Sequence, residues 1–136
     1  MKFLKLFEEF TQEGQVVAKI GSIPVKLKIP TTESEKRKGY MFSEGPAEDE
    51  GMLFVYPNES ILTFWMKNVD VPLDIIFFDS NRNIVDYKKM LPYQEGGEEV
   101  YYSSNTPARF AVELPAGWID KNLDQENLWD YKLNFL

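Results

Sequence analysis

Cysteine and histidine are both absent from the 136 residues of this chain. Without cysteine there is no disulfide framework, so stability has to come from a packed core. The two absences also exclude thiol nucleophiles, Cys–His dyads and Ser–His–Asp triads. Zinc, iron and copper sites usually depend on these residue types, so we expect no metal and no cofactor. A proton transfer near neutral pH would need a carboxylate, lysine or tyrosine with a shifted pKa.

Basic residues are outnumbered, with 15 Lys and Arg against 22 Asp and Glu and a net charge of −7. Affinity for nucleic acid comes mainly from clustered basic side chains, so we expect no nucleic-acid partner. The one compact basic cluster is Lys36, Arg37 and Lys38, and an acidic stretch follows it closely. We interpret this cluster as the solvated face of a helix. Long apolar runs are missing too, so we expect no membrane span.

The first ten residues, “MKFLKLFEEF”, resemble a secretion signal at first sight. Lys5 interrupts their apolar stretch, Glu8 and Glu9 close it, and no small-residue cleavage site follows, so we exclude a signal peptide. The chain as printed is therefore expected in the cytoplasm, whereas an exported protein would have had a leader removed. Apolar residues at helical spacing predict an amphipathic helix over residues 1–12, docked on the core or, alternatively, on a membrane surface or a partner.

Length and composition predict one domain over residues 1–136, with a β core over 16–136. Segments of strand type recur along that core between turn residues, at 16–20, 23–29, 51–56, 61–67, 73–78, 84–90, 100–103, 109–114 and 129–135. Many short strands with one short polar helix predict a mainly β fold, either a jelly-roll-like sandwich or a small barrel. Oligomeric state is left open by these patterns.

Two neighbouring segments near the start of the core predict local structure in more detail. Pro24 and the alternating lysines of 23–29 indicate an edge strand, in a hairpin with the strand before it. Thr32 and Glu35 then form a capping box, and Gly39 supplies a stop, which predicts a short polar helix between them.

The later segments predict where side chains point. Apolar residues at both parities predict central strands, buried on both faces, at 61–67 and 73–78. Alternation in 109–114 places Arg109 and Glu113 on the outward face. Alternation in the last segment turns its aromatic and leucine side chains inward, which are Trp129, Tyr131, Leu133 and Phe135.

Most oxygen-rich motifs of the sequence are weak. “DSNRNI” begins like a calcium-binding EF-hand loop, but Ile84 replaces the required Gly and Met90 the required Glu, so we read it as a hairpin turn. Carboxylate pairs of the kind used in glycoside hydrolysis could be drawn from four acids, Asp70, Asp74, Asp79 and Glu113. With so many acids in the chain, no pair stands out.

A polar cluster between two apolar segments is the strongest candidate site. Lys67, Asn68 and Asp70 lie between the segments, and Asp74 lies just inside the second one. A buried carboxylate is costly unless it is paired or accepts hydrogen bonds. One interpretation is a structural clamp, in which Lys67, the Asn68 side chain and turn amides hold Asp74. The other is a ligand pocket formed by Lys67, Asn68 and Asp74, with Trp65 and Tyr102 as its walls.

Four segments taken in order carry a family resemblance: “ESEKRKGYMF”, “EGMLFVYP”, “FWMKNVDVPLDIIFFDSNRNIV” and “YYSSNTPARFAVELPAGWIDKN”. They are similar to the Gly-Leu-Met segment, the Gly-Met-Leu-Phe strand, the hallmark Phe-Trp-Met-Lys-Asn and Pro-Leu-Asp run, and the Tyr-x-Ser, Glu-Leu and Ala-Gly segment of domain of unknown function 192. The resemblance implies a mostly β fold of jelly-roll-like or barrel-like type and no particular reaction. It implies that the family's characteristic positions are Gly39, Met41, Gly51, Met52, Trp65, Met66, Lys67, Asn68, Pro72, Leu73 and Asp74.

The chain departs from this family in two places. Many members carry a cysteine where this chain has “PYQEGGEEV”, so a thiol-based role cannot apply here. The family's Gly-Asp turn is replaced by “DQENLWDY”, which leaves the register of the last strand open.

Three functional hypotheses follow from the sequence. The leading one is a non-catalytic binding domain for a small polar ligand such as a saccharide, with the site at Trp65, Lys67, Asn68, Asp74 and Tyr102. The second is a carboxylate-based hydrolase or lyase, with Asp74 as acid or base and Lys67 as its electrostatic partner. The third is a protein-interaction module that uses the N-terminal helix or an edge strand.

Overall fold

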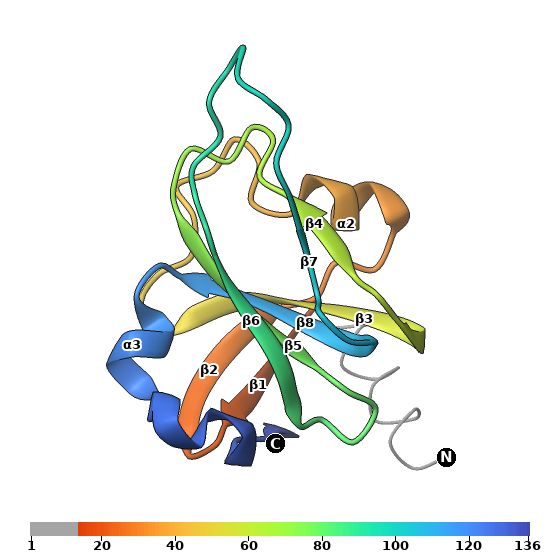
Figure 1. Ribbon diagram of the computed structural model, residues 1–136, viewed down its shortest axis with the longest axis vertical. Helices are drawn as coiled ribbons and strands as arrows, with labels where there is room; N and C mark the ends of the chain where they lie inside the picture. The colour runs from red at the N-terminus through yellow and green to blue at the C-terminus, as the bar shows by residue number, and fades with distance from the viewer. Residues whose placement is uncertain (1–13) are drawn as a thin grey trace.

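The computed structural model describes residues 14–136, so the helix expected over residues 1–12 lies outside the described part (Figure 1). The strands are β1 Gln15–Ile20, β2 Ile23–Lys28, β3 Glu50–Ser60, β4 Thr63–Trp65, β5 Leu73–Phe78, β6 Ile84–Met90, β7 Tyr101–Ser103, β8 Ala108–Pro115 and β9 Leu133–Phe135. The helices are α2 Glu33–Lys38, α3 Trp118–Asn122 and the 3₁₀ helix η1 Gln125–Asp130.

Seven strands form one mixed sheet in the order β6-β5-β8-β3-β2-β1-β9. The β2–β3 pair is parallel and the other pairs are antiparallel. The sheet curls so that its two edges approach at one end, where Asn83 bridges to Lys132 and the Leu133 N–H donates to the Arg82 carbonyl over 2.9 Å. The predicted mainly β class is confirmed, and the sheet does not close into a barrel.

Strand β5 is buried along its whole length because the sheet has a hydrophobic cluster on each face. Ile76 and Phe78 belong to the cluster on the concave side, together with side chains of β1, β2, α3 and η1. Leu73, Ile75 and Phe77 belong to the cluster on the other face. The expectation of a doubly buried strand at 73–78 is therefore confirmed, and successive residues of β5 point into different clusters.

A two-stranded ribbon, β4 paired with β7, covers the second cluster together with α2 (Figure 1). Phe64 of the ribbon packs edge-on against Phe54 of β3, with ring centroids 5.1 Å apart. Helix α2 forms as predicted: the Thr32 hydroxyl accepts the Glu35 N–H at 3.0 Å, and the Gly39 N–H closes the helix on the Glu35 carbonyl. Both elements stand on the same side of the sheet.

Three expectations about strands were wrong. β2 is an interior strand between β3 and β1, and Pro24 is tolerated because pairing with β3 starts only at Lys26. Segment 61–67 gives only the three-residue β4 in the ribbon instead of a central strand. Trp129 lies in η1 and is 58% exposed, because the chain becomes a strand only at β9.

Within residues 14–136, no helix is long and apolar enough to cross a membrane.

Candidate functional site

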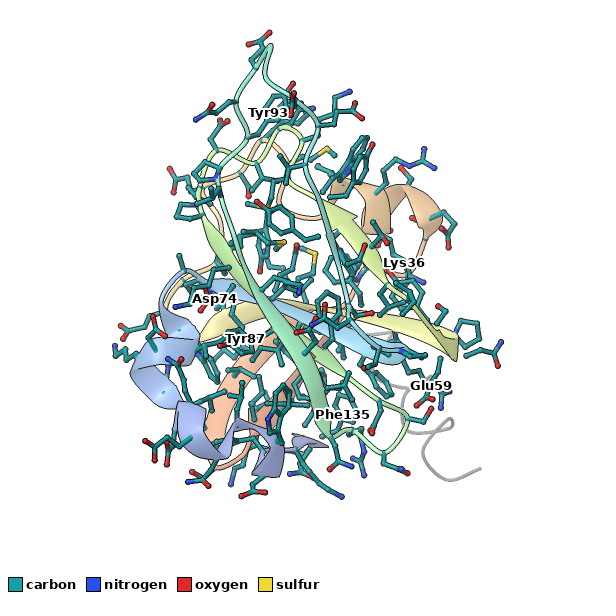
Figure 2. The ribbon with its side chains drawn as sticks, viewed as in Figure 1. Lys36, Glu59, Asp74, Tyr87, Tyr93 and Phe135 are labelled. Atoms are coloured by element: carbon teal, nitrogen blue, oxygen red, sulfur yellow. The ribbon has the colours of Figure 1, made fainter. Side chains whose placement is uncertain are left out.

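Asp74 is a structural acceptor on the concave side of the sheet. Its side chain leaves β5 toward α3, where its Oδ2 accepts the Ile119 N–H over 3.0 Å (Figure 2). The residue is 1% exposed. Burial raises the pKa of the Asp74 carboxyl, while hydrogen bonds from the Ile119 and Gly117 backbone and the charge of Lys89 oppose that rise. The predicted clamp on Asp74 therefore exists, but its partners belong to α3 instead of Lys67 and Asn68.

Lys67, Trp65 and Tyr102 come together elsewhere, at a cavity of about 630 Å³ beneath the loop that joins β6 to β7. The Lys67 ammonium lies 5.4 Å from the centre of the Trp65 ring, and the Tyr102 hydroxyl accepts the Leu91 N–H over 3.1 Å. Asn68 and Asp74 do not line this cavity. Asn68 has a φ of 61° within a tight turn that the Val69 N–H closes on the Met66 carbonyl over 3.0 Å, and its own carbonyl accepts the Phe42 N–H.

Glu113 is the buried acid that the sequence analysis placed wrongly. It lies on β8, opposite Met52 of β3 and Ile75 of β5, and therefore on the face of the sheet that carries the ribbon and α2. That face was expected to be exposed to solvent, but Glu113 is only 5% exposed. Within residues 14–136, its carboxyl has no hydrogen-bond or ion-pair partner in the protein, and its oxygens are not sealed from solvent.

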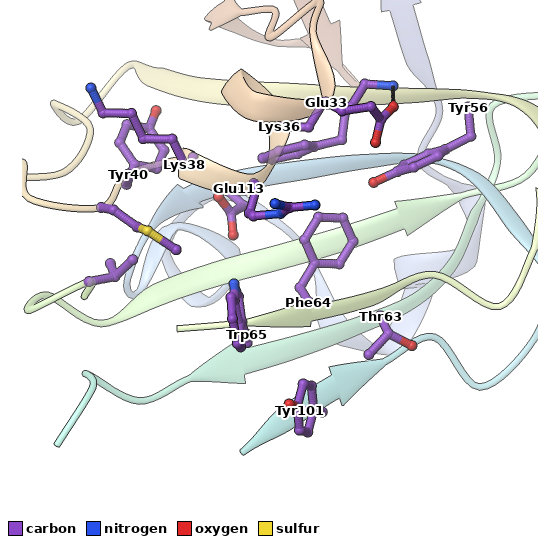
Figure 3. Close-up of a pocket in the computed structure, with 15 residues that line it drawn as sticks. Glu33, Lys36, Lys38, Tyr40, Tyr56, Thr63, Phe64, Trp65, Tyr101 and Glu113 are labelled. Atoms are coloured by element: carbon purple, nitrogen blue, oxygen red, sulfur yellow. Dashed lines mark ion pairs between the residues drawn. The ribbon is translucent and has the colours of Figure 1, made fainter. Parts of the chain in front are cut away.

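The Glu113 carboxyl points into a second cavity, of about 370 Å³ (Figure 3). One wall is the end of α2, where a Cβ at Gly39 would lie 3.6 Å from Glu113 Oε1. The opposite wall is the ribbon, with Phe64, Trp65 and Tyr101. In Figure 3 the nitrogen of the Trp65 ring points toward Glu113. The Tyr101 ring stacks against Trp65, with the two ring centroids 6.2 Å apart.

Burial without a partner makes Glu113 an acid that keeps its proton. Desolvation raises its pKa from 4.5 to about 8. Burial is also the main reason for the raised pKa of two tyrosines lining the cavity, Tyr40 and Tyr56, and the nearby Glu113 carboxyl adds to both rises. At neutral pH the cavity therefore presents a neutral carboxyl and neutral phenols, all of which can donate and accept hydrogen bonds.

The sequence did contain a signal for Glu113. It is the acid of the Glu-Leu pair in the fourth segment that resembles the family, and it interrupts an otherwise apolar strand. The alternation in β8 correctly separated it from Phe110, Val112 and Leu114. The missing information was that the ribbon and α2 cover the opposite face, which depends on contacts distant in sequence.

In the part of the chain that the structure describes, no group of three or more acidic side chains is placed so that it could hold a metal ion. The Glu113 cavity holds a second carboxylate, Glu33, but that side chain is exposed and lies 4.0 Å from the Lys36 ammonium. What the cavity can do chemically is bind a molecule by hydrogen bonds and aromatic contact, or give a proton to it.

Proteins of known sequence or structure resemble this chain over most of its length. A UPF0127 protein of Thermococcus sibiricus is 30% identical over 100 residues, which are 70% of this chain and 58% of that protein, so the chain spans less than two thirds of this relative. A Sinorhizobium meliloti 1021 structure, described as a candidate transcription regulator, superposes with a TM-score of 0.75 at 24% identity, covering 89% of this chain and 92% of that one.

A second structure, a protein of unknown function from Novosphingobium aromaticivorans, has a TM-score of 0.76 at 24% identity and covers 88% of this chain and 84% of that one. At these identities the two structures establish the fold alone. The family model described as DUF192, Uncharacterized ACR, matches residues 16–126, which is most of the chain. The chain therefore belongs to the DUF192 family.

Proposed function

We propose that this protein is a non-catalytic binding domain for a small polar ligand of saccharide type, held in the cavity above Glu113. Lys67 and Tyr102 would contact a ligand that reaches past Trp65 into the neighbouring cavity, since Trp65 lines both. We leave Asn68 and Asp74 out of the proposed site, because neither residue lines either cavity.

The unpartnered carboxyl of Glu113 is the observation that carries this proposal. Glu113 is 5% exposed, and because no fully buried side-chain oxygen of the described residues lacks a hydrogen bond, its carboxyl must reach the space of the cavity. A desolvated carboxyl with a raised pKa that faces an open cavity is typical of a functional site. Its hydrogen-bonding capacity suits hydroxyl groups, and the aromatic walls suit the apolar face of a sugar ring.

The test is an NMR titration of the ¹⁵N-labelled chain with monosaccharides and disaccharides. We expect the indole N–H of Trp65 to shift with saturable dependence on one of them, while the exposed Trp129 stays fixed. Glu113→Gln keeps a neutral hydrogen-bonding group and should still bind, whereas Glu113→Leu should not. If no sugar at millimolar concentration moves the Trp65 signal in the folded protein, the proposal fails.

A carboxylate-based hydrolase is the second candidate, with Glu113 replacing Asp74 as the acid. A general acid must hold its proton at the working pH, and the pKa of about 8 gives Glu113 this property. The titration separates the two functions, because an enzyme would release product that appears in the proton spectrum. Glu113→Gln would then bind the sugar and stop product release; sugar that stays intact after prolonged incubation excludes hydrolysis.

A further inference from the structure

The rim of the Glu113 cavity is cationic although the chain is acidic. The cluster interpreted from sequence as a solvated helix face, Lys36 to Lys38, lines the cavity from α2. In Figure 3 the Lys36 ammonium turns toward Glu33, and the Lys38 side chain extends outward past Tyr40. Glu33 is the only other lining carboxylate besides the protonated Glu113, and it lies 4.0 Å from the Lys36 ammonium. This cavity therefore has an excess of positive charge in a protein of net charge −7.

The three cations are not equivalent. Lys36 is held within the fold: its ammonium donates to the Val55 carbonyl over 3.1 Å, lies 4.9 Å from the centre of the Tyr56 ring and is 4.0 Å from Glu33. The side chains of Arg37 and Lys38 are exposed, and within residues 14–136 neither side chain has an ion-pair or hydrogen-bond partner. Two cations are thus available to a ligand at the mouth.

The cavity consequently has two chemically different ends. Its floor offers the neutral Glu113 carboxyl and its walls offer aromatic rings, which together fit a hydroxylated ring. Its mouth offers Arg37 and Lys38, which fit an anion, since a guanidinium binds carboxylates and phosphates through paired N–H groups. A neutral sugar would use only the inner end.

We infer that the ligand is an anionic sugar, a pyranose bearing a carboxylate or a phosphate, with ring hydroxyls at Glu113 and its anionic group between Arg37 and Lys38. This inference rests on the proposed function and assigns the substrate class of the same site. The role of the exposed cations predicts that affinity falls as ionic strength rises.

The experiment compares matched ligands on the full chain by calorimetry at low salt. Glucuronate and glucose 6-phosphate are titrated beside glucose, and acetate and inorganic phosphate are titrated as anions without a ring. We expect at least one anionic sugar to bind about tenfold or more tightly than glucose, which corresponds to one charge-assisted contact of about 1.4 kcal/mol. The carboxylate and phosphate arms identify which anion the mouth prefers.

The matched variants are Arg37→Gln/Lys38→Gln and Lys19→Gln/Lys132→Gln. Both remove two positive charges from exposed positions, but Lys19 and Lys132 do not line the cavity. The first variant should lose the tenfold preference for the anionic sugar and keep the affinity for glucose, while the second should keep both.

The possible failures are distinguishable. Equal affinity for glucose and the anionic sugars, or a preference that survives Arg37→Gln/Lys38→Gln, overturns the inference and leaves the proposed function standing. Binding of acetate or phosphate as tightly as of the anionic sugars overturns the role of the ring. Absence of binding by every sugar overturns the proposed function itself.

Discussion

Replacing Glu113 by glutamine should change how stability depends on pH. In the folded chain the carboxyl keeps its proton up to about pH 8, whereas in the unfolded chain it releases it near the ordinary value of 4.5. Between these values the folded state binds more protons than the unfolded state, so the free energy of unfolding decreases as pH rises. Below pH 4.5 both states are protonated and the effect vanishes.

The magnitude follows from the width of that interval, about 3.5 pH units. Each unit corresponds to about 1.4 kcal/mol, so the native protein should lose roughly 5 kcal/mol of stability between pH 4.5 and 8 through this one group. That is a large part of the 5–15 kcal/mol typical of a folded domain. Glu113→Gln has no proton to lose and should not show this decrease.

Urea unfolding at half-unit steps from pH 4.5 to 9, followed by tryptophan fluorescence, measures both curves. All other titrating groups are shared, so the difference between native and Glu113→Gln isolates the one carboxyl, and it should grow in favour of glutamine by about 1.4 kcal/mol per pH unit. Glu126→Gln removes an exposed acid by the same change of side chain and serves as the control. Parallel curves for Glu113→Gln would refute the reasoning, because they would mean that the carboxyl is solvated or paired with a cation.

Two further predictions concern residues that the structure assigns to the fold. Asp74→Ala should destabilise the protein by about 1–3 kcal/mol in urea unfolding, because the buried Ile119 N–H loses its acceptor, whereas Asp74→Asn keeps an oxygen there and should cost less. Neither should change ligand affinity at Glu113; a loss of affinity in folded Asp74→Asn would contradict the separation of the two sites. Gly51→Ala should unfold more easily, since its Cβ would overlap the Glu113 carbonyl oxygen and a leucine on either side; unchanged stability would show that β3 and β8 can separate there.

Local chemistry explains which parts of the fold were predictable. The helix at Thr32 and the hairpin of β1 and β2 follow from residues that are neighbours in sequence, and both were confirmed. The buried strand at 73–78 was predictable because apolar residues at both parities require cover on both faces. The interior position of β2 was not, because its parallel partner β3 begins more than twenty residues after β2 ends and the pattern of one strand does not identify its neighbours.

In the candidate site too, the sequence grouped residues that are close in the chain and missed those that are distant in it. Clustering in sequence suggested Asp74 with Lys67, yet β5 turns the Asp74 side chain toward α3, whereas Lys67 lies outside any strand and lines the cavity beneath the β6–β7 loop. Trp65, which was predicted as a wall of the site, lines both cavities, and Glu113, which lines one of them with it, lies almost fifty residues later. The sequence pattern does not predict such a neighbour, because it depends on how the ribbon packs over the sheet.

Two of the three buried acids of the sheet, Asp74 and Glu113, differ in how the protein compensates their burial. Asp74 and Glu113 are almost equally buried, at 1% and 5% exposure, and burial raises the pKa of both. Asp74 accepts backbone hydrogen bonds that order α3, so its burial is compensated within the chain. Glu113 has no such compensation among the described residues and opens into a cavity with cations at its mouth. The degree of burial therefore does not distinguish the two acids. Glu113 differs from Asp74 because it lacks a partner within the chain, and for this reason we expect a ligand to bind at Glu113.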